Sequence, residues 1–416
     1  MNILITGGGP AGMTAAIKAA EAGENAGKQV NITILDHSDR LGKKLRMTGN
    51  GHCNLTNEVL SSDPLSAYSF ADQRMLRNLF DRFGFEDTLA FFRSLGICIR
   101  NRDGLIYPYS DEAVSVVSAL SGALERYGIR VITDCGIRKI DRTGSGFTAE
   151  TTKGVFHADR LILACGGASY PKTGSDGSGY ALAKSFGHRV NTPVPGLVRL
   201  VGKGSFFKNV AGVRMKGRMS LFADGRVIKT EDGELQLTEK GISGIAVMNL
   251  SNLLSAEKGP FSVRIDLMPE FSEDMIRSML ADKIRTIPGN AAELFTGILP
   301  RKLGAHFLKT AKIRPDIPMK EIGSQQIKKL TETVKKWEIG IEDTGSFEEA
   351  QITLGGVDTA DLEDTLESRI VPGLYFAGEI LDLHGFCGGY NLQLCWTTGA
   401  VAGVNAVCAP TKVDIK

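Results

Sequence analysis

Three glycines near the amino terminus, Gly7, Gly9 and Gly12, have the spacing G-x-G-x-x-G. They stand between a short apolar run and an alanine-rich segment, where a strand would turn into a helix. In that context the first glycine makes the tight turn, the second lets the backbone approach a pyrophosphate, and the third lets the helix pack on the strand. The amino terminus of the helix then faces the phosphates. The motif therefore predicts a bound dinucleotide.

A carboxylate, Asp36, ends the second apolar run, VNITILDHS. It lies 24 residues after Gly12, somewhat beyond the usual ~20, and the excess falls in the polar segment GENAGKQ. An acid at this place accepts hydrogen bonds from ribose hydroxyls and disfavours a 2′-phosphate. The pattern favours FAD or NAD(H) over NADP(H).

A polar loop, MTGNGHCNLTN at 47–57, follows soon after, and Lys43 and Lys44 precede it. Glycine-rich turns present backbone N–H groups to anions, and the lysines would add positive charge. The alternative is a solvated loop that only joins two elements. Because the loop comes directly after Asp36, its position favours contact with the pyrophosphate and ring of a flavin dinucleotide.

The elements that must position these residues alternate between strand and helix, which predicts an α/β fold. Further predicted elements are helices within 65–100, a helix from about Asp111, a strand at 129–133, a buried strand Leu161–Cys165, a helix near Gly179 and a last helix from about Asn391. No second G-x-G-x-x-G follows in the sequence, so a separate nicotinamide domain is not expected.

The pattern of residue types changes at about Asn191. Two prolines there precede short β runs that are separated by Gly, Asp and Lys. Amphipathic patterns follow, including SQQIKKLTETVKKWEI, which predict helices. The sequence thus predicts a split Rossmann-type FAD-binding domain with an inserted β-barrel-like domain and a helical subdomain. The predicted boundaries are 1–190 and 346–416 for the FAD-binding domain, 191–275 for the β-rich insertion and 276–345 for the helical part.

Composition narrows the classes of protein. The 416 residues include 49 Lys and Arg and 47 Asp and Glu, so the net charge is +2. This near-neutral charge favours a small-molecule substrate over a nucleic acid or a membrane surface as partner. Seven scattered cysteines without a CxxC pair favour reduced thiols in the cytoplasm over a disulfide framework or a metal site. No signal peptide or membrane span is expected, and the oligomeric state stays open.

A resemblance to a known family rests on five segments spread through the chain: GGGPAG, LGKKLRMTGNGHCNLTN, LACGGASYPKTGSDGSGYALA, GELQLTEKGISGIAVMNLS and PGLYFAGEILDLHGFCGGYNLQLCW. They resemble the YhiN-like flavoproteins, a family also labelled BaiN-like or aminoacetone-oxidase-like. The resemblance implies FAD, a three-part architecture and an oxidoreductase activity. It also implies that loop 47–57 lines the pyrophosphate and flavin side of the FAD cleft.

The same resemblance carries cofactor roles onto particular residues. Diphosphate contacts are implied for Gly7, Gly9, Ala11 and Gly12, and an adenine-ribose contact for Asp36. Residues along the diphosphate and ring would be Lys43, Lys44, Gly49, Asn50, Gly51 and Asn54. The adenine end would be flanked by Ile137, Ala164 and Gly166, and the ribityl chain held by Gly378 and Glu379. The pyrimidine side of the flavin would meet Gly389, Tyr390, Asn391 and Leu392, where a helix amino terminus stabilises negative charge. The family pattern has an arginine at His52 and frequently an aspartate at His384.

No catalytic acid or base is assigned from the sequence, and His384 and Tyr390 are the candidates. His384 would exchange a proton with a substrate beside the ring, but an ordinary hydrogen-bonded loop histidine is the preferred interpretation. A covalent flavin bond through His52, Cys53 or Cys387 is not expected. No metal site is expected either.

The function expected from the resemblance is FAD-dependent hydride exchange between flavin N5 and a small organic substrate. In the reductase hypothesis, the flavin accepts a hydride from transiently bound NADH or NADPH. The reduced flavin then reduces a C=C bond in a steroid-like or bile-acid-like ketone. The rival enzyme is an amine oxidase that passes electrons to oxygen, with an aminoacetone-like substrate. A non-catalytic flavin-binding interaction or sensor module is the alternative from another class. An RNA-modifying flavoprotein is also considered, but the near-neutral charge and the absence of a basic stripe disfavour it.

Overall fold

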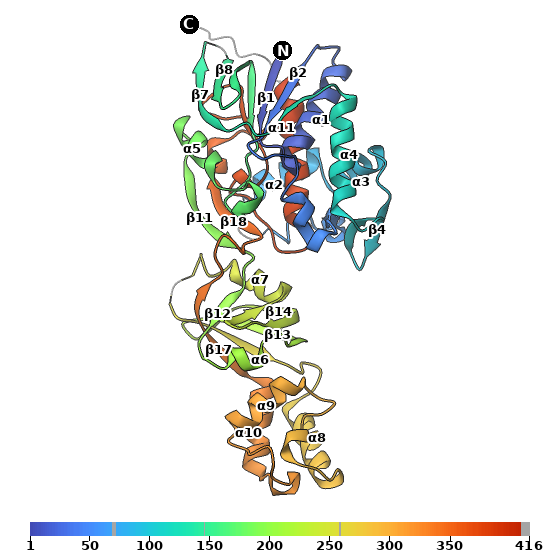
Figure 1. The fold of residues 1–416 in the computed structure, drawn as a ribbon, viewed down its shortest axis with the longest axis vertical. Helices are drawn as coiled ribbons and strands as arrows, with labels where there is room; N and C mark the ends of the chain where they lie inside the picture. The colour runs from blue at the N-terminus through green and yellow to red at the C-terminus, as the bar shows by residue number, and fades with distance from the viewer. Residues whose placement is uncertain (69–71, 145, 258, 409–416) are drawn as a thin grey trace. The chain divides into compact units, whose positions relative to one another are not determined.

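The computed structural model describes residues 1–68, 72–144, 146–257 and 259–408. Its chain divides into two compact units (Figure 1), Met1–Pro195 with Phe347–Lys416, and Gly196–Ser346. The first unit is therefore built from both ends of the sequence, and the second is inserted between them.

A parallel sheet forms the centre of the first unit, with strand order β19-β10-β1-β2-β6. Its strands are β1 (Asn2–Thr6), β2 (Asn31–Leu35), β6 (Arg130–Ile132), β10 (Arg160–Leu163) and β19 (Leu374–Phe376). Successive strands are added on either side of β1, and such a reversal of order opens a crevice at the carboxyl ends of the strands. The glycine motif begins at the end of β1, so it stands at this crevice.

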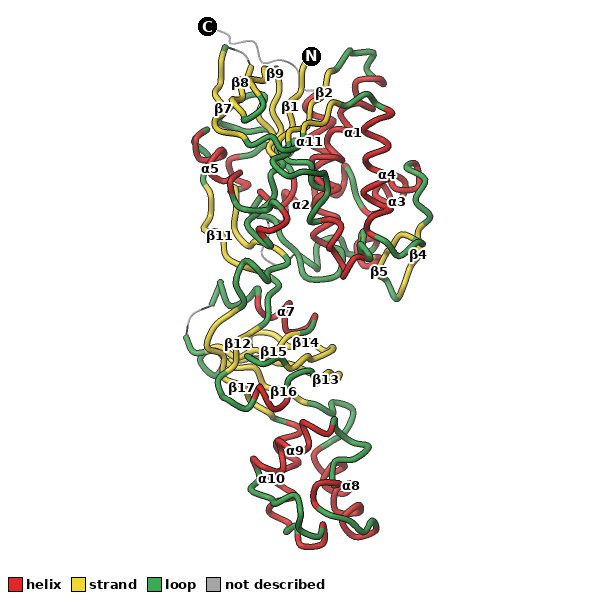
Figure 2. Tube along the Cα trace, in the orientation of Figure 1, coloured by secondary structure: helices red, strands yellow, loops and turns green. Residues whose placement is uncertain are grey.

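Helices α1 (Pro10–Asn25) and α11 (Tyr390–Cys408) pack against each other beside the sheet, as Figure 2 shows. Small residues make the close approach possible. A Cβ at Gly399 would lie 2.5 Å from the Ala11 carbonyl oxygen, and one at Gly403 would lie 2.2 Å from the Ala15 carbonyl oxygen. Because backbone meets backbone, α11 is held rigidly against the helix that follows the glycine motif.

The rest of the first unit surrounds this core. Its other helices are α2 (Gln73–Arg82), α3 (Phe85–Ser94), α4 (Ala113–Arg126) and α5 (Ser178–Ser185). One smaller sheet contains β3 (Thr56–Asn57), β5 (Leu105–Pro108) and β4 (Ile99–Arg102). Another contains β7 (Ile137–Thr143), β8 (Gly146–Thr151) and β9 (Gly154–Ala158). Strand β11 (Val190–Gly196) pairs with β18 (Ile352–Val357). Short 3-10 helices are η1 (Leu45–Gly51), η2 (Glu58–Ser61), η3 (Pro171–Thr173), η6 (Thr359–Asp361) and η7 (Gly378–Ile380).

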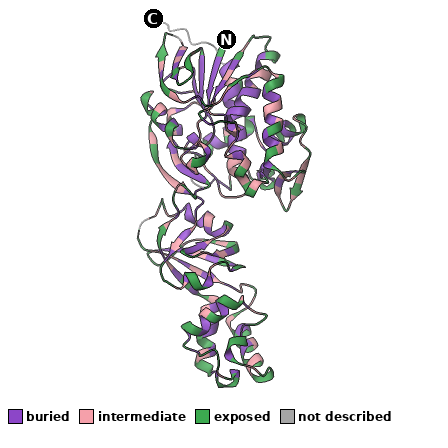
Figure 3. Ribbon diagram, in the orientation of Figure 1, coloured by how far each residue is buried: buried purple, intermediate pink, exposed green. Residues whose placement is uncertain are grey.

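The second unit contains a closed barrel with strand order β12-β15-β14-β13-β16-β17. Its strands are β12 (Leu200–Gly202), β13 (Arg214–Ala223), β14 (Arg226–Leu237), β15 (Gly241–Ser243), β16 (Phe261–Asp266) and β17 (Trp337–Thr344). Its helices are α6 (Phe207–Val210), α7 (Ile245–Ser251), α8 (Glu273–Thr286), α9 (Arg301–Thr310) and α10 (Ser324–Lys335), with η4 (Ala291–Glu293) and η5 (Met319–Glu321). Buried residues continue from the barrel into the helices (Figure 3), and their side chains belong to one hydrophobic core.

The predicted fold class, a split α/β domain with an inserted barrel and helices, is confirmed. One predicted helix was wrong at its end: α10 stops at Lys335, and Trp337 starts strand β17. Burial alternates along β17, and the strand pairs with β16 and β12 to close the barrel. The pairing partners are distant in sequence, so the local helical pattern could not reveal them. The predicted boundaries between four domains stay predictions.

Candidate functional site

The turn between β1 and α1 has the geometry that the glycine motif predicts. Gly7 has φ +98°, and a Cβ there would lie 2.3 Å from the Ala164 carbonyl oxygen. A Cβ on Gly12 would lie 1.9 Å from the Gly7 carbonyl oxygen. Gly9 differs, because an added Cβ would meet nothing within 4 Å, and it caps the amino terminus of α1. Open space over helix N–H groups fits the diphosphate of a dinucleotide.

Asp36 lies at this same turn. One carboxylate oxygen accepts a hydrogen bond from the Gly8 N–H at 2.6 Å, and the other accepts from the Ser38 N–H at 2.7 Å. An ionised carboxylate accepts about four hydrogen bonds, so each oxygen keeps capacity for a ribose hydroxyl. The carboxylate is thus oriented by the backbone before any ligand binds.

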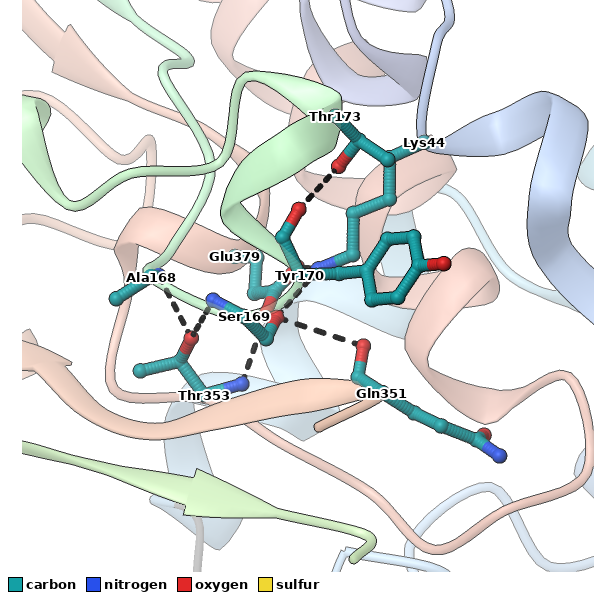
Figure 4. Close-up of polar contacts among 8 residues, drawn as sticks. All are labelled: Lys44, Ala168, Ser169, Tyr170, Thr173, Gln351, Thr353 and Glu379. Carbon is teal, nitrogen blue, oxygen red and sulfur yellow. Dashed lines mark hydrogen bonds and ion pairs between the residues drawn. The ribbon is translucent and has the colours of Figure 1, made fainter. Parts of the chain in front are cut away.

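The two lysines before the polar loop lie in different surroundings. Lys44 Nζ donates to Glu379 Oε2 at 2.6 Å and to Ser169 Oγ at 2.5 Å (Figure 4). Lys43 Nζ instead lies 3.1 Å from Asp39 Oδ1, and with Arg40, the larger influence, it holds the pKa of that carboxyl at about 2. The structure therefore brings Lys44 into a network with the predicted ribityl residue Glu379, and leaves Lys43 in a local ion pair.

The polar loop contains several residues in the left-handed region: Gly49, Asn50, Gly51 and Cys53 have φ of 56°, 56°, 91° and 58°. A Cβ on Gly51 would meet nothing within 4 Å. Asn54 Oδ1 accepts from the Ile106 N–H at 3.2 Å, and Trp396 Nε1 of α11 donates to the Leu55 carbonyl at 2.9 Å. The loop is thus attached both to strand β5 and to the last helix.

The glycine-rich loop before α11, residues 385–389, packs directly on the polar loop 47–57. A Cβ on Gly389 would lie 2.9 Å from the Thr56 carbonyl oxygen and 3.0 Å from Asn54 Cγ. Asn57 Nδ2 donates to the Gly388 carbonyl at 2.9 Å, and Thr56 Oγ1 donates to Gln393 Oε1 at 2.6 Å. These roles of Thr56, Asn57 and Gln393 were not predicted, although the three residues lie within the family segments.

At the start of α11, Asn391 folds its own loop. Its side chain accepts from the Gly385 N–H at 2.8 Å and donates to the Gly385 and Phe386 carbonyls at 3.0 Å and 3.2 Å. The Tyr390 carbonyl accepts from the Tyr68 hydroxyl at 2.9 Å, and Leu392 is partly buried against the core. These contacts fix the direction in which the amino terminus of α11 points.

The residues predicted at the adenine end come from two different sheets. Ile137 begins β7, and Ala164 and Gly166 follow β10, where Gly166 has φ +76°. Gly378 has φ +80°, and a Cβ there would lie 2.7 Å from the Ala11 side chain. Ala164, Gly166 and the predicted ribityl residue Gly378 follow β10 and β19, so they border the carboxyl edge of the parallel sheet, which is the edge that the glycine turn occupies.

The proton-transfer candidates are partly buried. His384 is 11% exposed and its Nδ1 lies 3.7 Å from Asp382 Oδ1. Burial lowers the pKa of His384 and outweighs the opposing charge of Asp382. Burial also raises the pKa of Tyr390 and raises that of Cys387 to about 11. At neutral pH these conditions favour a neutral imidazole and a protonated thiol.

The remaining candidates from the loop are less suited to chemistry. His52 is half exposed, and its Nδ1 lies 2.9 Å from the Asp111 carbonyl oxygen. Burial raises the pKa of Cys53 to about 12, so its thiol stays protonated. Across the described ranges, no group of three or more His, Cys, Asp or Glu has an arrangement suited to a metal ion. Within the same ranges, every helix is too short or too polar to cross a membrane.

Comparison with known proteins places this geometry in a family. The family model described as HI0933-like protein Rossmann domain matches residues 1–405. A 3-dehydro-bile acid delta(4,6)-reductase of Clostridium scindens is 40% identical over 98% of this chain and 100% of its own. A ribosomal RNA dihydrouridine synthase of Haemophilus influenzae is 28% identical over 95% of this chain and 96% of its own.

Solved structures agree on the fold. The 3-ketosteroid-delta4-(5alpha)-dehydrogenase of Rhodococcus jostii RHA1 aligns with a TM-score of 0.51 at 14% identity, covering 97% of this chain and 96% of its own. A flavocytochrome c3 fumarate reductase aligns with a TM-score of 0.50 at 18% identity, covering 98% of this chain and 78% of its own. The resemblance inferred from the five sequence segments is confirmed, and the protein is an FAD-dependent oxidoreductase. The chain belongs to the HI0933-like Rossmann-domain family.

Proposed function

We propose that the protein reduces a C=C bond conjugated to a ketone in a steroid-like or bile-acid-like small molecule. The observation that carries the proposal is the relationship to the Clostridium scindens reductase, at 40% identity over essentially the whole of both chains. Identity of this extent covers the inserted unit as well as the nucleotide-binding segments.

The residues described above in the first unit fit FAD. The glycine turn at Gly9 would hold the diphosphate, and Asp36 the adenine ribose. Glu379 would accept hydrogen bonds from the ribityl chain, and the amino terminus of α11 would lie against the pyrimidine ring. When bound, FAD supplies a ring that accepts or delivers a hydride. The protein's own task is to hold substrate and ring in register and to exclude water.

Reduction of a conjugated C=C bond takes up a hydride and a proton, so a proton source is required near the substrate. We assign this task to His384. Its lowered pKa leaves the ring neutral at pH 7. The neutral ring would take a proton from solvent to become an imidazolium, which would then donate that proton to the substrate and return to the neutral form. Asp382, 3.7 Å from Nδ1, would stabilise the ring when it is transiently charged.

The electron donor is proposed to be NADH or NADPH that binds transiently. Anaerobic titration of the purified holoprotein tests this: NADH or NADPH should bleach the flavin absorbance, and an unsaturated 3-keto bile acid should restore it. Bleaching by a small amine, with peroxide formed on admitting air, would instead establish the amine oxidase. Flavin that exchanges electrons with neither set of compounds would leave a non-catalytic flavin-binding module.

A second candidate is the reduction of uracil in RNA, which is also a C=C bond conjugated to a carbonyl. The ribosomal RNA dihydrouridine synthases of Haemophilus influenzae and Escherichia coli are both 28% identical to this chain. The charged residues are unevenly distributed between the two units. Residues 196–346 carry 24 Lys and Arg against 18 Asp and Glu, and the rest of the chain carries 25 against 29. The near-zero net charge thus conceals a basic inserted unit, which favours a polyanion.

Basic and aromatic residues share one face of α9 in that unit. Lys302, His306 and Lys309 follow the i, i+4, i+7 spacing, and the His306 ring stacks on Phe206 at 4.5 Å between centroids. Binding of a fluorescent uridine-rich RNA tests the second candidate. K302E/K309E should weaken binding and flatten its salt dependence, whereas K328E/K329E on α10 should have a smaller effect. Equal affinities of all three proteins would exclude this face as an RNA site.

A further inference from the structure

Four residues far apart in sequence meet at the carboxyl edge of the parallel sheet (Figure 4). Lys44 follows β2, Ser169 follows β10, Glu379 follows β19, and Thr353 lies on β18. Ser169 Oγ donates to Glu379 Oε1 at 2.6 Å, and the Thr353 N–H donates to the same oxygen at 2.8 Å. Lys44 Nζ donates to Glu379 Oε2 at 2.6 Å. The carboxylate is therefore held at both oxygens.

The direction of each bond follows from the donors present. Lys44 Nζ also donates to Ser169 Oγ at 2.5 Å, so the Ser169 proton is directed to Glu379. The other acceptor within reach of that hydroxyl, the Gln351 carbonyl, is more distant at 3.5 Å. Lys44, Ser169 and Glu379 thus form a closed ring of charge-assisted hydrogen bonds.

Thr353 fixes the backbone that carries Ser169. Its Oγ1 accepts from the Ala168 N–H at 2.8 Å and from the Ser169 N–H at 3.0 Å. Ser169 and Thr353 are 0% and 1% exposed, so neither hydroxyl exchanges partners with solvent. A Cβ at Gly167 would lie 2.4 Å from Thr353 Oγ1, so a glycine at that position is required for the contact.

A count of donors and acceptors indicates what the network offers to a ligand. Glu379 accepts three of about four hydrogen bonds, and Lys44 uses two of its three N–H donors. With respect to the part of the chain that the structure describes, one acceptor position and one cationic donor therefore remain, side by side. This pair is complementary to a hydroxyl next to an anionic oxygen, as occurs where a polyhydroxyl chain joins a phosphate.

We propose that Ser169 and Thr353 are positioning residues that hold Lys44 and Glu379 as a preformed donor and acceptor for the ribityl phosphate part of FAD. The proposal rests on the proposed function only in taking FAD as the cofactor, and it is independent of the substrate. Ser169 and Thr353 act through Glu379 and Lys44. Their loss therefore weakens cofactor binding without removing a group that itself touches the cofactor.

The test measures the dissociation constant of FAD from protein stripped of its cofactor, by quenching of flavin fluorescence. S169A should raise this constant about tenfold to a hundredfold, the range for a hydrogen bond to a charged group. The control is S251A in the inserted unit, where another buried serine accepts from the Val198 N–H at 3.1 Å and donates to the Met248 carbonyl at 2.7 Å. S251A should bind FAD as the wild type does, even if its unfolding temperature falls as much as that of S169A.

Two further comparisons separate positioning from general stability. T353S keeps the hydroxyl and should restore most of the affinity that T353V loses. In an E379Q background, S169A should have a much smaller additional effect, because its partner carboxylate is gone. Full additivity of S169A and E379Q, or loss of affinity in S251A equal to that in S169A, would overturn the proposal. Wild-type protein that binds FAD but turns over no substrate would refute the proposed function alone.

Discussion

The glycines of the first turn differ in what surrounds them, although the sequence motif treats them alike. Gly12 is confined by backbone, since a Cβ there would lie 1.9 Å from the Gly7 carbonyl oxygen. Gly9 has φ −79°, which any residue adopts, and a Cβ added there would meet nothing within 4 Å. Gly12 is therefore required by the fold, and Gly9 by the ligand.

This difference gives a prediction for two substitutions. G12A should destabilise the cofactor-free protein, because overpacking against backbone costs ~1–3 kcal/mol. G9A should leave the unfolding temperature of the cofactor-free protein unchanged and should weaken FAD binding by tenfold or more. Thermal unfolding and fluorescence titration of both variants check this. Tight FAD binding by G9A would contradict a diphosphate at that position.

At the scale of elements, the packing of α1 on α11 connects the two ends of the chain. The contact is between small residues, and glycines 399 and 403 let α11 approach the α1 backbone. The same helix carries Trp396, which donates to the Leu55 carbonyl in the polar loop. The first and last motifs of the sequence are thus held together by one helix pair.

Substitution at this contact should be costly despite the gain in helix propensity. G403A should lower the free energy of unfolding by ~1–3 kcal/mol, because a Cβ would lie 2.2 Å from the Ala15 carbonyl oxygen. The matched control is G122A in α4, where the nearest heavy atom is the end of Arg126 at 3.6 Å. That change should stabilise the helix by ~0.5–1 kcal/mol. Urea denaturation of both variants measures the contrast, and a stabilising G403A would refute the close contact.

At the scale of the whole molecule, each unit has its own hydrophobic core. The residues proposed to hold FAD all come from the first unit, Met1–Pro195 with Phe347–Lys416. Ligand binding stabilises the folded state of the unit that it contacts. The two cores should therefore respond differently to the cofactor.

Calorimetry of the cofactor-free protein should resolve two unfolding transitions. FAD at 100 times its dissociation constant should stabilise the first unit by ~2.7 kcal/mol and raise the temperature of that transition. The transition of the inserted unit, residues 196–346, should not move. A single transition that FAD shifts as a whole would show that the units unfold as one.

Much of the nucleotide-binding half could be predicted from the sequence, because its signals are local. A glycine turn, the strand before it, the helix after it and the acid at Asp36 are contiguous patterns, each with its own steric or electrostatic cause. The β-rich insertion was also predictable from its short strands. The end of α10 was not, because the fate of Trp337 depends on strand pairing with residues far away in the chain.

Tertiary structure alone decided which side chains meet. Lys44 and Lys43 are neighbours with the same charge, yet Lys44 pairs with a carboxylate 335 residues away, and Lys43 with Asp39 beside it. Ser169 lies within one of the five family segments but had no predicted role, and Thr353 lies outside them. Their roles exist only where β10, β18 and β19 converge. The physical reason is that composition and spacing fix local conformation, whereas a hydrogen bond between distant residues depends on how the whole sheet is assembled.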